Sequence, residues 1–158
     1  MKRMKRLSDL QNLRRGEKKN NPLSTVALYE LAAGRGVPVY AFDLKNVPSL
    51  SIMDEDGGCV VGMAPTLAGQ REKLCLAHEL GHCITGAFYN RHSSGAVRGK
   101  SEYKADKWAF YHLLPPMAVE KAMAAGLTRP HELAEYFDVP EEFLLRALDY
   151  YACVRPFN

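Results

Sequence analysis

The stretch "LCLAHELGHCITGAF", residues 74–88, constrains the fold of this chain more than any other segment. Its apolar residues recur at intervals of three and four, which predicts one buried α-helix. Among the residues of this stretch are the polar His78, Glu79 and His82. A buried polar side chain needs a bonding partner, because leaving water without one costs free energy. The fold must therefore bring partners to this helix.

His78 and His82 are four residues apart. On an α-helix this spacing separates two side chains by about 40° around the axis and about 6 Å along it. Both imidazoles can therefore bind one ion, whereas Glu79 lies beside the pair. This is the HExxH arrangement of zinc peptidases, in which the glutamate accepts a proton from the attacking water. The alternative is an ordinary buried helix whose histidines are satisfied within the core.

A catalytic zinc site uses three protein ligands, so one more must come from elsewhere. A third histidine of the metzincin type is excluded, because Phe88 stands at its position. Downstream, Glu102 and Asp106 are four residues apart on a second expected helix. We predict that Glu102 is the third ligand and that Asp106 accepts a hydrogen bond from a ligating histidine. The alternative is two solvated acids on an amphipathic helix.

The rest of the sequence predicts an α+β fold, mainly helical, with a short three-stranded antiparallel sheet packed on the HExxH helix. The strand candidates are rich in β-branched and apolar residues and are separated by Pro, Asp and Gly. They are residues 37–44, 49–54 and 59–64. Further helices are expected over residues 25–33, over 101–114, from Pro116 toward Gly126, and as a helical hairpin within 129–152.

We expect three parts along the chain: a basic tail over residues 1–20, a metallopeptidase core over 21–126 and the C-terminal hairpin over 127–158. Up to Lys19 there are eight Lys and Arg against two acids, so the basic balance belongs to the tail. Such charge runs are usually solvated. With 158 residues, of which 47% are hydrophobic, the chain is long enough for one hydrophobic core.

The sequence has no apolar run near the roughly 20 residues that cross a bilayer, and its start lacks the apolar core of a signal peptide. We therefore expect a cytoplasmic protein without a membrane partner. The cysteines are scattered and form no CxxC pair, which favours reduced, buried thiols. These cysteines are Cys59, Cys75, Cys83 and Cys153.

Three motifs resemble those of the ImmA/IrrE family of small metallopeptidases, whose site layout is similar to that of gluzincins. They are "REKLCLAHELGH" (71–82), "EYKADKWAFYHLLP" (102–115) and "LAEYFDVPEEFLLRAL" (133–148). The resemblance implies zinc ligands at His78, His82 and Glu102, a catalytic Glu79 and a supporting Asp106. These are the residues that the spacing already indicated.

The resemblance also implies a substrate, namely a helix-turn-helix transcriptional repressor of a phage, mobile element or stress response. Two alternatives stay open. One is a metal-stabilised anti-repressor that sequesters the repressor without cutting it. The other is a DNA-binding regulator, which Glu141 and Glu142 disfavour because their charge has the wrong sign for phosphates.

The mechanism expected from these residues is hydrolysis of a peptide bond with Zn²⁺, or with Mn²⁺ as the alternative ion. A donor must stabilise the developing oxyanion, and no spacing selects one. The candidates are His112, Tyr103, Tyr89 and His92. Extended substrate is expected to pair with an edge strand, for which "CVVGMAP", residues 59–65, is the candidate.

Overall fold

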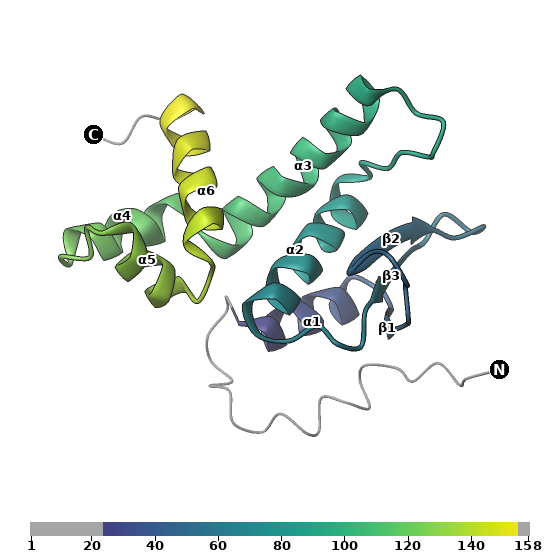
Figure 1. The fold of residues 1–158 in the computed structure, drawn as a ribbon, viewed down its shortest axis with the longest axis horizontal. Coiled ribbons are helices and arrows are strands. Elements are labelled where there is room, and N and C mark those ends of the chain that lie inside the picture. The colour runs from purple at the N-terminus through teal and green to yellow at the C-terminus, as the bar shows by residue number, and fades with distance from the viewer. Residues whose placement is uncertain (1–23, 155–158) are drawn as a thin grey trace.

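The computed structural model describes residues 24–154, so the basic tail predicted for residues 1–20 lies outside the described part. Within this range, a small sheet lies at one side of a group of helices (Figure 1). No helix of the range is long and apolar enough to cross a membrane. The elements in order are α1 (Thr25–Gly34), β1 (Val39–Ala41), β2 (Ser49–Met53), β3 (Cys59–Met63), α2 (Gly69–Thr85), α3 (Gly95–Leu113), α4 (Pro116–Ala124), α5 (Pro130–Phe137) and α6 (Glu141–Val154).

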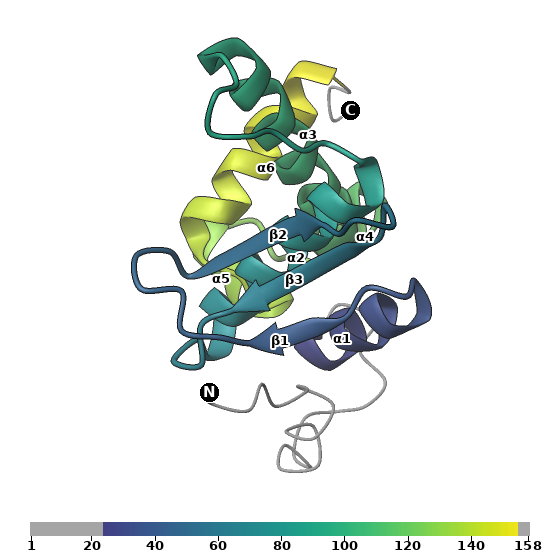
Figure 2. The ribbon, with the colours of Figure 1, turned by 90° about the vertical axis from the view of Figure 1, so that its right-hand side faces the viewer.

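The sheet has the strand order β1-β3-β2 and covers one side of α2 (Figure 2). β2 and β3 form an antiparallel hairpin, in which Ser49 pairs with Met63. β1 pairs with β3 in parallel, with Val39 opposite Val61. The prediction of a purely antiparallel sheet is therefore wrong for β1. The chain reverses twice between β1 and β3, so these neighbours run in the same direction.

Serine caps set the starts of two helices. The Ser24 hydroxyl accepts a hydrogen bond from the Ala27 amide at 3.1 Å, at the start of α1. The Ser94 hydroxyl does the same for the Val97 amide at 3.3 Å. This second cap starts α3 at Gly95, earlier than residue 101, so part of the expected loop is helical.

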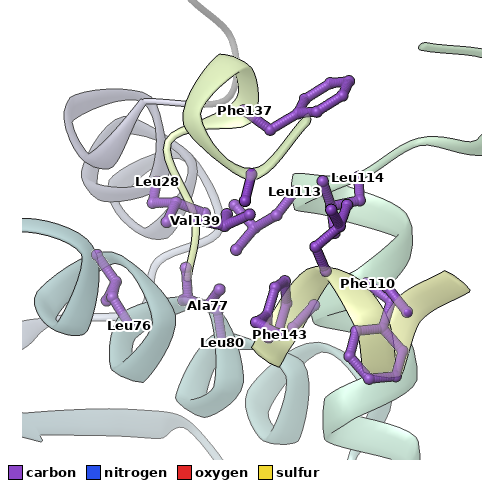
Figure 3. Packing of buried hydrophobic residues seen from close by; sticks show 14 of the residues in the cluster. Leu28, Leu76, Ala77, Leu80, Phe110, Leu113, Leu114, Phe137, Val139 and Phe143 are labelled. Atoms are coloured by element: carbon purple, nitrogen blue, oxygen red, sulfur yellow. The ribbon is translucent and has the colours of Figure 1, made fainter. Parts of the chain in front are cut away.

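One hydrophobic core joins α1, α2 and the helices that follow (Figure 3). Leu76, Ala77 and Leu80 of α2 are fully buried. They lie in the same cluster as Phe110 and Leu113 of α3 and several side chains of the C-terminal helices. The Tyr151 hydroxyl of α6 also donates to the carbonyl of Leu114 at 2.8 Å. The C-terminal hairpin is thus packed against the helices that carry the HExxH motif and its expected third ligand.

α2 and α3 run side by side in opposite directions (Figure 1) and approach as closely as their backbones allow. A Cβ atom added to Gly81 would lie 2.6 Å from the carbonyl oxygen of Ala105 and 2.9 Å from its Cα. Real Cβ atoms do not approach backbone this closely. Glycine is therefore required at residue 81 for this helix pair to pack.

A disulfide joins Cys59 of β3 to Cys83 in the last turn of α2, at a sequence separation of 24. The prediction that these cysteines are reduced is therefore wrong. The pair is distant in sequence and meets because the sheet packs on α2. A cross-link of this loop length stabilises a fold by about 3 kcal/mol in the chain-entropy account. The cysteines consequently give no support to a reducing compartment.

We predict that Gly81→Ala lowers the free energy of unfolding by about 1–3 kcal/mol, because α2 and α3 must move apart to admit the methyl group. The matched control is Gly99→Ala in α3, where an added Cβ meets nothing within 4 Å. That substitution is expected to raise stability by up to about 1 kcal/mol. Urea unfolding of both variants measures the difference, and equal stabilities would contradict the close packing.

Candidate metal centre

The two histidines of α2 direct their Nε2 atoms to one point. His78 Nε2 and His82 Nε2 lie 3.1 Å apart, as the i, i+4 spacing predicted. His82 is buried, whereas His78 is partly exposed. One imidazole therefore comes from the interior and the other from the rim of the same site.

Glu102 of α3 completes the cluster. Its Oε2 lies 3.0 Å from His78 Nε2. Its Oε1 lies 3.4 Å from His82 Nε2. Ligand atoms of the three residues all fall within 4.8 Å of one another. Two imidazole nitrogens and one carboxylate oxygen are the donor set of a His₂Glu catalytic zinc site. The residues present therefore fit the metal that the sequence implied.

The remaining ring nitrogens are both hydrogen-bonded. His78 Nδ1 lies 3.0 Å from Asp106 Oδ1, where the sequence predicted a supporting carboxylate. His82 Nδ1 lies 2.5 Å from the carbonyl oxygen of Ala87. That carbonyl is brought back to the ring by Gly86, whose φ of 65° ends α2 in the left-handed region. An acceptor at each Nδ1 places the proton there and leaves Nε2 free to bind an ion.

Arg146 of α6 also hydrogen-bonds Asp106, through the carboxylate oxygen that His78 does not contact. Burial opposes ionisation of Asp106, but the hydrogen bond from His78 and the charge of Arg146 lower its pKa below the ordinary value. Burial likewise opposes protonation of His78, and the hydrogen bond and charge of Asp106 raise its pKa. Arg146 was not predicted as a site residue. Its signal was an arginine inside the apolar run "FLLRAL".

Glu79 lies beside the cluster and is held by the sheet. Its side chain is buried, and its Oε1 accepts a hydrogen bond from the Ser49 hydroxyl at 2.8 Å. Ser49 is the first residue of β2. No pattern in the sequence pointed to it, because its role depends on how the sheet packs on α2.

A groove of about 640 Å³ opens over these residues. His78, Glu79 and Glu102 line it, and so does the segment that leads into β2 and forms its first residues, 47–51. The expectation that residues 59–65 provide the edge strand is wrong, because β3 is the central strand. β2 is the edge strand beside the groove, since β3 pairs with β1 on its other side.

The model of the IrrE N-terminal-like domain, a peptidase family, matches residues 32–149 of the chain. The chain belongs to this family. The match spans both site helices and confirms the resemblance that the three motifs carried. No curated protein matches the chain.

Of the four candidate oxyanion donors, Tyr89 lines the groove. Hydrogen bonding to Glu102, together with burial, raises the pKa of the Tyr89 hydroxyl. Tyr103 packs on another tyrosine, and the ring of His112 stacks on a tryptophan. His92 is exposed and hydrogen-bonds its neighbour Arg91. None of these three is among the residues that line the groove.

We predict that the metal-free protein binds one zinc ion per chain and gains about 2.7 kcal/mol of stability at a free zinc concentration 100 times Kd. His82→Ala and Glu102→Ala each remove one of the three clustered donors and should abolish this gain. His92→Ala removes an exposed histidine outside the cluster and should keep it. Calorimetric titration and thermal melting measure both effects. Zinc binding that survives both site variants would contradict the assignment.

Proposed function

We propose that this protein is a zinc-dependent endopeptidase that cleaves a protein substrate, namely a helix-turn-helix transcriptional repressor. The observation that carries the proposal is the convergence of His78, His82 and Glu102 beside Glu79 in one groove. Membership of a peptidase family supports the same activity.

His78, His82 and Glu102 would hold the ion, with zinc favoured by the mixed nitrogen and oxygen donors and manganese as the alternative. Bound zinc would lower the pKa of a water molecule to about 7 and polarise the scissile carbonyl. Asp106 and the Ala87 carbonyl keep both imidazoles in the tautomer that presents Nε2.

Glu79 is the proposed general base. It accepts the proton of the attacking water and returns it to the leaving amine. The hydrogen bond from Ser49 ties its carboxylate to β2 at the wall of the groove. Tyr89, at the groove wall, is the proposed donor to the oxyanion.

Substrate would enter as an extended strand beside β2. An edge strand offers backbone groups for pairing, and the groove follows β2 past Glu79. A groove of about 640 Å³ has room for a short peptide segment of a larger protein, which suits an endopeptidase. Specificity would then come from docking of the folded partner around the groove as well as from the groove itself.

The repressor substrate rests on the resemblance to the ImmA/IrrE family. The C-terminal hairpin is the proposed surface for recognising it, and direct DNA binding is not expected. Glu141 and Glu142 open α6 with negative charge, which repels phosphates. The cytoplasm is the proposed compartment, because a transcriptional repressor acts there.

The test uses the zinc-loaded 158-residue chain and a helix-turn-helix repressor, taken from a gene adjacent to that of the protein where one is encoded there. Wild type should cut the repressor, whereas Glu79→Gln should keep its zinc and lose cleavage by about 10²-fold or more, since the amide cannot accept the proton. Mass spectrometry of the products and zinc analysis of both proteins provide the readouts.

Two results would contradict the proposal. Cleavage that persists in zinc-loaded Glu79→Gln would remove the assigned base. An intact repressor that nevertheless leaves its operator on long incubation with wild type would instead indicate the anti-repressor, which binds without proteolysis.

A further inference from the structure

We propose that Arg146 is a positioning residue of the metal site, which acts on the ligand His78 through Asp106. The inference rests on the proposed function, because it assigns His78 to a metal. It extends the site to the C-terminal hairpin, since Arg146 lies on α6 and is 40 residues from Asp106 in sequence.

Asp106 is a bridge between two partners. Its Oδ1 lies 3.0 Å from His78 Nδ1, and its Oδ2 accepts a hydrogen bond from Arg146 Nη2. The two partners use opposite oxygens of one carboxylate. Rotation of the carboxylate therefore breaks at least one of these bonds, and Arg146 holds the orientation that His78 needs.

Arg146 lies between α6, which carries it, and α3. Its guanidinium lies over the ring of Phe110, 5.5 Å from the ring centroid. Around it along α6, Phe143, Leu144 and Ala147 are buried in the core. Among the residues that line the groove, Arg146 is the one lysine or arginine. The position of Arg146 is thus set by the packing of the hairpin, and its guanidinium lies beside the carboxylate of Asp106.

The consequence for a bound ion follows from the tautomer of His78. The ion takes Nε2, so the proton must stay on Nδ1, and Asp106 keeps it there. Without Arg146, the carboxylate can turn away and the ring loses its fixed orientation. Substitution of a residue that hydrogen-bonds a metal ligand directly lowers metal affinity by about 10–100-fold.

Charge alone predicts the opposite result. Removing a positive charge near a cation site reduces repulsion and tightens cation binding. If the substitution of Arg146 weakens zinc binding, the cause is therefore the lost positioning of His78, because the lost positive charge would strengthen binding. This difference in sign makes the inference testable with one substitution and one control.

The experiment measures the zinc affinity of the full-length protein by competition with a chelator. Arg146→Met should weaken binding by about tenfold. Arg146→Lys, which keeps a charged donor, should recover most of the affinity. The control is Lys104→Met, which removes an exposed positive charge on α3, two residues from both Glu102 and Asp106, and should change affinity less than about twofold.

A second readout separates positioning from a general structural role. In the metal-free protein, at a pH high enough for the ring to be neutral, the ¹⁵N chemical shifts of His78 should show the Nδ1–H tautomer in wild type and a mixture of tautomers in Arg146→Met. Circular dichroism and the urea midpoint check that each variant is folded. If Arg146→Met does not fold, Arg146→Ala carries the test, because it also removes the donor to Asp106 and should lose the same affinity.

The outcomes are distinct for the two proposals. Equal or tighter zinc binding by Arg146→Met than by wild type would overturn the inference and leave the proposed function intact. Wild type that binds no zinc would overturn the proposed function. In that case the His78 shifts still decide whether Arg146 orients the ring, and unchanged shifts in the variant would refute it.

Discussion

The close contact between α2 and α3 is the constraint on which the candidate site depends. Gly81 lets the two backbones meet at Ala105, because any side chain at residue 81 would collide with that backbone. Gly81 lies between the motif residues of α2, and Ala105 lies between Glu102 and Asp106. The contact thus brings two imidazoles on one helix against two carboxylates on the other.

Placing polar groups in this interior is tolerated because each has a partner. Among residues 24–154, no buried side-chain nitrogen or oxygen lacks a hydrogen bond. The same holds outside the site, where buried Lys73 donates to the carbonyl of Phe137 at 2.9 Å and the Tyr29 hydroxyl donates to Glu72 at 2.8 Å. A buried charge without such partners would cost several kcal/mol. The polar network is therefore a condition of the fold as well as of the site.

The parts of the site that could be predicted from the sequence are those that depend on local geometry. The i, i+4 spacing of His78 with His82, and of Glu102 with Asp106, places each pair on one helix face before any tertiary structure is known. The wrong predictions, and the site residues that were not predicted, all depend on how helices and strands pack against one another. The parallel pairing of β1, the central place of β3 and the Cys59–Cys83 disulfide all follow from how the sheet folds onto α2. Ser49 and Arg146 reach the site in the same way, from a strand and a helix distant in sequence.

The most direct test of the central claim, that α2 and α3 together build a two-histidine, one-carboxylate zinc site, is X-ray absorption at the zinc edge of the loaded protein. Such a site should show two imidazoles and additional oxygen ligands, with nitrogen and oxygen at about 2.0–2.2 Å. Scattering from sulfur at about 2.3 Å would contradict it, because a thiolate such as that of Cys75 in the groove wall would then hold the ion.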